Sequence, residues 1–460
     1  AMNFDFRQMK PVIQQEMDDI LQHYPTDFDD FRAQVPTGGD TYARKRAIVI
    51  PAAQRCPVHI FPHCPFAFAV DFGEPRHICY LGLGNLCRDK CGVDFSPLRA
   101  FGGRLVAQGF GNVYEYTDHL HRTLDHDKLL AVGFRGVYEE CERLNAAETD
   151  EEKRRWRALV MDCCLTVRTL GERLRQRAAE LAPNAADEDA RYNLQRIVAS
   201  VNTPWEAPVT LFDAMNTILA ATWFISALDG VEMNAYGQLD RLLQPYYEAD
   251  LAAGRTTEEE AYFLLQCFLH KTDMHCNFNT TDRTSYDNGV SVMIGGCDPD
   301  GAPVYNDMTR MILRAYTENR LINPKLNARA AADSPREYFA DLAALMRTGN
   351  NNLVVENDDW IIPMFLRMGL SPEDARTYVG NGCQEVICRN QLHSRAFAYF
   401  NMAQVLLDTC LYTEETLPEE KREFFRGGRF DKDSFEALQS SFLANLRALI
   451  AALAEQFRPY

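Results

Sequence analysis

A thiol and a carboxylate stand two residues apart in the stretch Gly380-Asn381-Gly382-Cys383-Gln384-Glu385. Two glycines precede the cysteine, and glycine permits a tight backbone and the close approach of another chain segment. Glu385 could act on the same substrate as Cys383 if the loop is extended or turned. Loops of this composition are more often structural than catalytic, so these six residues alone leave both interpretations open.

A cysteine can also serve as an ionic nucleophile, but it then needs a base that activates the thiol. His393 is the only histidine close to Cys383 in the sequence. A helical α/β protein with an unrelated cysteine nucleophile is therefore kept as an alternative.

The remaining cysteines do not indicate a metal site. The chain has 14 cysteines and no secretion signal, which indicates reduced thiols in a reducing compartment. Cys87 and Cys91 have CxxxC spacing, but no third cysteine follows at the spacing of an iron–sulfur cluster. Cys163 and Cys164 lie inside a helical pattern, and we expect them to be small buried hydrophobic residues.

The composition bounds the class of partner. With 48 basic and 65 acidic residues the formal net charge is −17, which argues against nucleic acid or an anionic membrane surface. The first twenty residues contain no apolar core of a signal peptide, and no apolar run approaches the length needed to span a bilayer. We therefore expect a cytoplasmic protein with 46% hydrophobic residues and a sizeable core.

Apolar periodicity predicts an α/β chain. Helical patterns cover residues 8–35, 125–181, 210–229, 256–271, 305–320, 335–348 and 360–368, and a further helix begins at Pro372. Strand-like runs lie at 46–52, 64–72, 289–296, 321–329, 352–358 and 378–386, and 178–190 is the best candidate for an internal linker. Strands and helices alternate in the second half, which is typical of an α/β layer or barrel.

The segments around Cys383 carry a wider pattern. An Asn-Asp-x-x-Ile-Ile segment is followed by Gly-x-Ser-x-Glu-Asp-Ala-Arg-x-Tyr and then by Gly-Cys-x-Glu. The residues of this pattern are Asn357, Asp358, Ile361, Ile362, Gly369, Ser371, Glu373, Asp374, Ala375, Arg376, Tyr378, Gly382, Cys383 and Glu385. In this order and spacing they resemble the glycyl radical enzymes, the pyruvate formate-lyase-like group.

Upstream segments extend this resemblance to roughly residues 115–460. They are a His-x-x-x-Asp…Gly pattern, a Gly-x-x-Asp…Pro-Tyr-Tyr segment and an Asn-Pro-x-x-x-x-Arg pattern. Their residues here are His121, Asp125, Gly133, Gly237, Asp240, Pro245, Tyr246, Tyr247, Asn323, Pro324 and Arg329. Residues 2–114 match only loosely and form a divergent N-terminal region.

The resemblance implies a radical mechanism. In this family a radical S-adenosylmethionine activase installs a glycyl radical on a loop near the C-terminus, and that radical takes hydrogen from a cysteine on an opposing loop. By the match, Cys383 is this cysteine, and its thiyl radical abstracts hydrogen from the substrate. In the eliminating branch the Glu two residues later moves a substrate proton, which is the role implied for Glu385. The pyruvate-cleaving branch of the family has a Cys-Cys pair at this place, which this chain lacks. Elimination or decarboxylation is therefore the expected reaction.

Departures from the family pattern bear on the substrate. In the family that this chain resembles, polyol-dehydrating members have a His-Ser pair at the positions of Glu232 and Met233. Gln238 also replaces a family Arg. We therefore do not expect a glycerol-like substrate. Arg389 and His393 could hold an anionic group. Together with His121, Glu232 and Met233 they are the candidate substrate-binding residues.

The implied fold is a helical N-terminal layer (115–200) plus one half of a ten-stranded α/β barrel (201–460), with about five strands and the Cys loop. No Arg-Val-x-Gly-Tyr glycyl loop occurs in the chain. We therefore expect no cofactor bound in this chain, and a glycyl radical supplied by a C-terminal segment or a second polypeptide and installed by the activase. We also expect a homo-oligomer. The alternative within the resemblance is a non-catalytic or regulatory relative that binds a small molecule or a partner enzyme.

Overall fold

The structure is a computed structural model, and the part of the chain that it describes comprises residues 3–22, 32–56, 58–66, 69–70, 86, 90–113, 122–200, 204–229, 234–277, 290–319, 321–350, 352–381, 385–388, 398–428 and 434–459. The chain packs into two compact units: unit 1 is Ala1–Cys91 with Asp118–His393, and unit 2 is Gly92–Thr117 with Ser394–Tyr460. The regions 2–114, 115–200 and 201–460 divide the chain by resemblance rather than by packing, and they stay a prediction.

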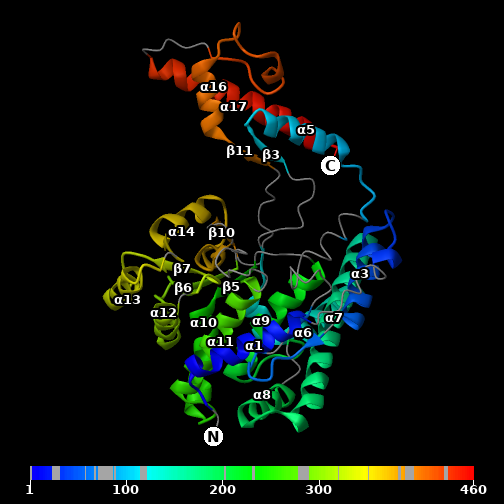
Figure 1. Ribbon diagram of the computed structural model, residues 1–460, viewed down its shortest axis with the longest axis vertical. Coiled ribbons are helices and arrows are strands. Elements are labelled where there is room, and N and C mark those ends of the chain that lie inside the picture. Colours follow the sequence, from blue (N-terminus) through cyan, green and yellow to red (C-terminus); the bar gives the residue numbers. More distant parts are fainter. Residues whose placement is uncertain are drawn as a thin grey trace. The chain divides into compact units, whose positions relative to one another are not determined.

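A parallel sheet of five strands lies in unit 1, in the order β4-β5-β6-β7-β8 (Figure 1). Its strands are β4 (Arg122–Thr123), β5 (Asn234–Gln238), β6 (Ser291–Gly295), β7 (Lys325–Ala330) and β8 (Leu353–Asn357). β6 and β7 are buried along almost their whole length, as expected for a parallel sheet that is covered on both faces. The strands predicted at 289–296, 321–329 and 352–358 are confirmed.

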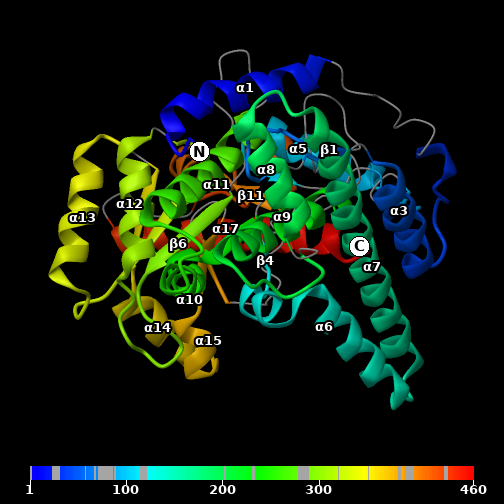
Figure 2. The same ribbon diagram turned by 90° about the horizontal axis from the view of Figure 1, so that it is seen from below.

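Helices cover this sheet. α10 (Leu239–Ala252), α12 (Asp307–Glu318) and α13 (Arg336–Arg347) lie between successive strands in the chain, and Figure 2 shows α12 and α13 side by side. α12 begins at a capping box in which the Asn306 side chain accepts from the Thr309 N–H, and the Thr309 hydroxyl accepts from the Asn306 N–H. α9 (Leu211–Asp229) and α11 (Glu258–Asn277) bury most of their described side chains.

A layer of helices completes unit 1. α7 (Glu151–Leu181) packs against α3 (Thr41–Arg55), α6 (His126–Ala146) and α8 (Glu188–Ala199). Figure 2 shows α6 and α7 as a long helical hairpin. α1 (Phe6–Gln22) contacts α11 through an apolar side that includes Phe6, Met9 and Ile13. The helical pattern predicted at 125–181 is confirmed as α6 and α7.

Two expectations about the N-terminal half are wrong. The β-branched run at 46–52 lies inside helix α3, which Asp40 caps and which buries Ile48 and Val49. Packing against α7 outweighs the local strand preference of these residues. Residues 178–190 are not a linker between domains, because they contain the end of α7, a 3₁₀ turn (Ala182–Asn184) and the start of α8 within the same unit.

Unit 2 has a small core of its own. It contains α5 (Ser96–Ala107), β3 (Gly111–Val113), β11 (Ala398–Phe400), α16 (Met402–Leu411), a 3₁₀ turn (Glu419–Lys421) and α17 (Phe435–Phe457), and β3 pairs with β11 in antiparallel fashion. In this core Phe424 meets Phe101 and Phe110 edge to face, and Phe110 stacks on Phe425. The Nζ of Lys421 lies 2.6 Å from a carboxylate oxygen of the buried Asp408.

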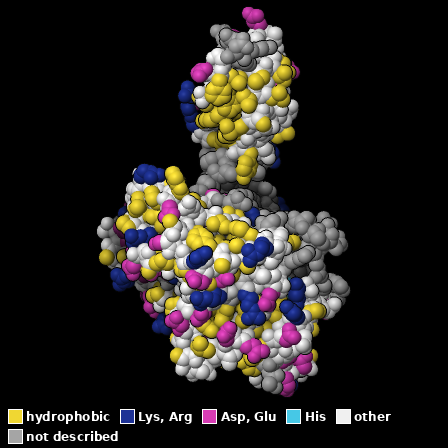
Figure 3. All heavy atoms as spheres, turned by 90° about the vertical axis from the view of Figure 1, so that its left-hand side faces the viewer, with side chains coloured by type: hydrophobic (Ala, Val, Ile, Leu, Met, Phe, Trp, Pro, Cys, Tyr) yellow, Lys and Arg dark blue, Asp and Glu magenta, His cyan; other side chains and the backbone are white. Residues whose placement is uncertain are grey.

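One face of unit 2 is strongly apolar. Figure 3 shows hydrophobic side chains gathered on its face, and the exposed apolar residues of α16 are Met402, Leu406, Leu407 and Leu411. α17 has 23 residues and a hydropathy of 1.3, and by length and composition alone it could cross a membrane. The expectation that no apolar run approaches that length is therefore wrong. The apolar window of α17 that passes this test is 17% buried, and Asn445 of α17 is buried and donates to Thr409 of α16.

Candidate active site

The segments on either side of Cys383 pair as a β-hairpin. β9 (Val379–Asn381) and β10 (Glu385–Ile387) pair in antiparallel fashion, with Glu385 opposite Asn381. Residues 382–384 join the two strands, and Cys383 therefore lies outside the described residues. Glu385 is the first residue of β10 and is half-buried, whereas Asn381 is fully buried. The turn predicted after the strand is thus bounded by two short paired strands.

The hairpin packs on one face of the parallel sheet. Val379 and Ile387 share a buried apolar cluster with Ala235 of β5 and Met293 of β6. The Ser291 hydroxyl, from the start of β6, donates a 2.7 Å hydrogen bond to the carbonyl oxygen of Gly380. The sheet therefore fixes the strand that enters the Cys383 loop through both apolar and polar contacts.

Gly380 is required by close packing. A Cβ at this position would lie 2.1 Å from Nδ2 of Asn327 and 2.3 Å from Oε1 of Glu356. Asn327 lies on β7 and Glu356 lies on β8. Glu356 is directly opposite Arg329 of β7, and Asn327 is two residues before Arg329 on the same strand. Side chains two residues apart in a strand point to the same face of the sheet, so both contact the hairpin from one face.

A buried charge cluster lies beside this contact. Arg329 is fully buried and donates from Nε and Nη2 to the two carboxylate oxygens of Asp358, at 3.0 and 2.8 Å. The Tyr378 hydroxyl donates to the same carboxylate at 2.5 Å, and the Arg329 guanidinium lies 4.3 Å from the Tyr378 ring. Burial opposes the positive charge of Arg329, but the facing Asp358 carboxylate more than offsets this and raises the pKa of Arg329.

Two polar residues hold the carboxyl end of β6. Asp240 accepts hydrogen bonds from the Gly295 N–H at 2.8 Å and from the Thr309 hydroxyl at 2.7 Å. Burial raises the pKa of Asp240 to about 6, although both hydrogen bonds oppose this shift. Gln238 donates to the Gly295 carbonyl at 2.6 Å. The side chain that replaces a family Arg is therefore buried and bonded to the sheet backbone.

His121, Glu232, Met233, Arg389 and His393 lie outside the described residues. Their predicted roles in substrate binding stay predictions. Within the described part of the chain, no group of three or more His, Cys, Asp or Glu side chains could hold a metal ion.

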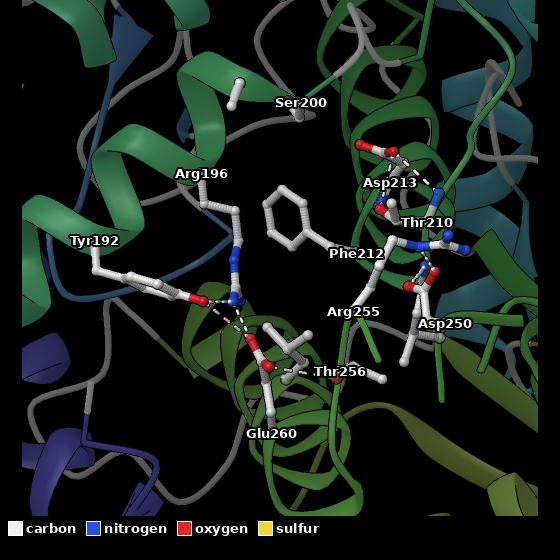
Figure 4. Close-up of a pocket in the computed structure, with 13 residues that line it drawn as sticks. Tyr192, Arg196, Ser200, Thr210, Phe212, Asp213, Asp250, Arg255, Thr256 and Glu260 are labelled. Atoms are coloured by element: carbon white, nitrogen blue, oxygen red, sulfur yellow. Dashed lines mark hydrogen bonds and ion pairs between the residues drawn. The ribbon is translucent and has the colours of Figure 1, made fainter. Parts of the chain in front are cut away.

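A cavity of about 290 Å³ lies elsewhere in unit 1, among α8, α9, α10 and the start of α11. Figure 4 shows that ion pairs line it, and these are Arg196 with Glu260 and Arg255 with Asp250. None of its lining residues comes from the hairpin or from the sheet beneath it. This cavity is therefore not the site that the Cys383 pattern predicts.

The sequence predicts a strand and a loop at 378–386, but neither the returning strand β10 nor the residues that support the hairpin. Sequence reasoning matched Arg329, Asp358 and Tyr378 to a family pattern and gave them no role, although they form one hydrogen-bonded group. It missed Ser291, Asn327 and Glu356 altogether. Polar residues inside otherwise apolar strands were the available signal, because such residues in a buried parallel sheet need a partner.

Comparison with known proteins identifies the family. Residues 105–456 match the family model described as pyruvate formate lyase-like. The isethionate sulfite-lyase of Desulfovibrio desulfuricans is 29% identical over 297 residues, which are 61% of this chain and 35% of that protein. The trans-4-hydroxy-L-proline dehydratase of Clostridioides difficile is 24% identical over 322 residues, which are 68% of this chain and 40% of that protein.

Solved structures agree in fold. The glycerol-bound form of the B12-independent glycerol dehydratase from Clostridium butyricum has a TM-score of 0.80 at 19% identity, and the match covers 99% of this chain and 63% of that one. A glycyl radical enzyme from Archaeoglobus fulgidus has a TM-score of 0.77 at 19% identity, with 97% of this chain and 63% of that one covered. The chain thus spans between about a third and two thirds of the length of these relatives. With its family-model match, its glycyl radical relatives and their shared fold, the chain belongs to the pyruvate formate lyase-like family of glycyl radical enzymes.

Proposed function

We propose that this chain is part of a radical lyase that eliminates a heteroatom group from a small polar substrate, or decarboxylates it, with Cys383 as the hydrogen-abstracting residue. The observation that carries the proposal is the Gly-Cys-x-Glu sequence on a hairpin packed against a parallel sheet. Relatives whose names describe sulfite elimination and dehydration support the reaction class.

The proposed reaction begins and ends at the Cys383 sulfur. A thiyl radical on Cys383 takes a hydrogen atom from a substrate carbon, so that an S–H bond forms and a C–H bond breaks. The substrate radical then expels its heteroatom group with the bonding electron pair, while Glu385 accepts a proton from a neighbouring substrate heteroatom. The product radical recovers a hydrogen atom from the Cys383 thiol, which regenerates the thiyl radical.

The hairpin's support suits this chemistry. Hydrogen abstraction needs the sulfur held within contact of the substrate carbon, in a site that excludes water. Ser291 and the Asp358 cluster fix the entering strand of the hairpin, and the buried apolar cluster packs both of its strands. A loop fixed at both ends loses less freedom when the substrate binds.

The substrate class follows from the departures noted above. Glu232 and Met233 stand where polyol-dehydrating members have a His-Ser pair, so we infer a small polar substrate other than glycerol. A direct comparison of glycerol, propanediol, choline-like and hydroxy-amino-acid substrates tests this. Efficient glycerol dehydration would contradict the inference.

The proposal includes the partners of the family. A glycyl-loop segment or second polypeptide would supply the radical, a radical S-adenosylmethionine activase would install it, and the five-stranded sheet would form half of a ten-stranded barrel in a cytoplasmic homo-oligomer. Electron paramagnetic resonance after treatment with the activase tests the arrangement. The 460-residue chain alone should give no glycyl doublet, and a doublet should appear once the glycyl-loop segment is present.

A non-catalytic relative is the alternative function. It would give no turnover with any substrate even when the doublet is present. A doublet together with turnover of at least one substrate supports the lyase, and a doublet without turnover across the panel supports the alternative.

A further inference from the structure

Two polar side chains lie under the Cys383 hairpin without the hydrogen bonds that buried polar groups normally make. Glu356 is 6% exposed and Asn327 is 1% exposed. Both carboxylate oxygens of Glu356, and Oδ1 of Asn327, lack a hydrogen-bond partner among the described residues. Roughly nine in ten buried polar groups in proteins are paired, so these three atoms require an explanation.

Both side chains press on the strand that leads to Cys383. The close approach is to Gly380, three residues before the cysteine, where no Cβ would fit beside Asn327 and Glu356. The hairpin strand therefore covers the Glu356 carboxyl in the folded chain. If the hairpin moved away from the sheet, this carboxyl would gain access to water.

We propose that Glu356 is a positioning residue, and that its protonated carboxyl lets the Cys383 hairpin sit on the sheet while its ionised form releases the hairpin. The inference rests on the proposed function only in taking Cys383 as the working thiol. The physical reason is desolvation. A neutral carboxyl tolerates a dry site, whereas a carboxylate without hydrogen bonds does not.

The charges around Glu356 do not remove this cost. Burial raises the pKa of Glu356 to about 7, and the charge of Asp358 at the start of α14 (Asp358–Arg367) adds to this rise. The charge of Arg329 of β7 and the nearby hydroxyl of Tyr378, the residue directly before β9, lower it. Arg329 is already bonded through two nitrogens to Asp358, and Tyr378 donates to that same carboxylate. Two of the three guanidinium nitrogens of Arg329 and the Tyr378 proton are thus engaged with Asp358, and Nη1 of Arg329 makes no hydrogen bond to Glu356 or to any other described residue.

The sign and size of the effect follow from linkage. The hairpin is seated most firmly below the ordinary pKa of a glutamate, where Glu356 is protonated in both arrangements. Its seating weakens as the pH rises towards 7, and the effect is complete above that value. If Glu356 has an ordinary pKa when the hairpin is released, the equilibrium constant for release rises about tenfold between pH 6 and pH 8.

The rate of Cys383 alkylation tests this in the 460-residue chain. Iodoacetamide modification, followed by peptide mass spectrometry, is compared between the wild type and Glu356→Gln from pH 5.5 to 8.5. At each pH the Cys383 rate of the wild type is divided by that of Glu356→Gln, which cancels the effect of thiol ionisation because this effect is common to both proteins. We expect this ratio to rise about tenfold from pH 6 to pH 8. The rate at Cys410, an exposed thiol of unit 2, should be equal in the two proteins at every pH.

A flat ratio across this range would overturn the proposal, as would the same rise for Glu337→Gln, an exposed glutamate of α13. If Glu356→Gln does not fold, hydrogen exchange of residues 376–388 in the wild type takes its place. Opening should then be about tenfold more frequent at pH 8 than at pH 6 after correction for intrinsic exchange, and equal opening overturns the proposal. Neither readout measures turnover, so the failure of the lyase proposal would be seen separately.

Discussion

The Tyr378 hydroxyl donates a 2.5 Å hydrogen bond to Oδ1 of Asp358, the carboxylate that also accepts two hydrogen bonds from Arg329. Tyr378 is the residue directly before β9, and Asp358 directly follows β8. This single bond therefore ties the start of the Cys383 hairpin to the carboxyl end of a sheet strand. All three side chains are buried, so each depends on the others for its polar contacts.

Substitutions of Tyr378 and of Asp358 should both destabilise unit 1, by different amounts. Tyr378→Phe deletes one hydrogen bond to a charged group and should lower the free energy of unfolding by about 1.5–3 kcal/mol. Asp358→Asn leaves Arg329 buried without a counter-charge and should cost about 3–5 kcal/mol. Urea unfolding followed by tryptophan fluorescence measures this, because all four tryptophans lie in unit 1.

The adjacent Asp359 provides the matched control. It is exposed, and it accepts from the Ala332 N–H at 2.9 Å. An asparagine amide oxygen can accept the same bond, so Asp359→Asn should cost less than about 1 kcal/mol. Equal losses for the substitutions at 358 and 359 would contradict the buried role of Asp358.

A methyl group at Gly380 should disturb the hairpin. Gly380→Ala would bring Cβ against Asn327 and Glu356, and we expect a loss of about 1–3 kcal/mol with faster hydrogen exchange across residues 376–388. Adding Glu356→Ala should recover part of this loss, because it removes one of the two side chains that the new methyl group would meet. Gly103→Ala, which meets no atom within 4 Å, should leave exchange in this segment unchanged. Strictly additive losses in the double variant would show that the contact is not the cause.

Stability should fall in alkaline solution because of His63. Its Nδ1 lies 2.6 Å from Glu16 and its Nε2 lies 2.9 Å from Asp187, and the Glu16 hydrogen bond, against the effect of burial, raises the pKa of His63 to about 9. A raised histidine pKa stabilises the fold fully below about pH 6.5, and the stabilisation is lost as the pH rises through 9. The loss should be on the order of 1–2 kcal/mol, reduced by solvent screening because the Asp187 side chain is 55% exposed.

Comparing the wild type with His63→Gln isolates the contribution of His63 to the free energy of unfolding. Other titrating groups are common to both proteins, so the difference in their unfolding free energies should be largest near pH 6 and should shrink by pH 9.5. A difference that stays constant over this range would show that His63 is neutral in the folded chain.

The sequence predicts the second half of unit 1 better than the first. The strands and helices from β6 to β9 follow clear changes of period bounded by caps such as Asn306 and Ser371, so local signals and tertiary packing agree. The strand predicted at 46–52 is wrong, because packing against α7 outweighs the strand preference of these residues. Burial of Glu356 could not be predicted, because it depends on a hairpin strand that packs on β7 and β8 from more than twenty residues away.

Cys383 can be tested most directly in the completed and activated enzyme. Cys383→Ser should abolish detectable turnover, because the O–H bond of serine is too strong for a glycyl radical to break. The glycyl doublet should persist in this variant, since the radical is stored on another residue. The change replaces one sulfur by oxygen, so we expect the free energy of unfolding to change by no more than about 1 kcal/mol. Cys410→Ser, at an exposed thiol of unit 2, is the matched control and should leave turnover unchanged.

Glu385→Gln separates the two proposed steps. Glutamine cannot accept the substrate proton, so turnover should fall by about 10²–10⁴-fold, the usual contribution of a positioned acid or base. Hydrogen abstraction by Cys383 does not use this carboxylate, so exchange of deuterium from labelled substrate into the thiol pool should continue in Glu385→Gln and stop in Cys383→Ser. Loss of both turnover and exchange in Glu385→Gln would mean that Glu385 positions the substrate rather than moving its proton.

Retention of turnover in Cys383→Ser would remove the basis for a thiyl radical at this position.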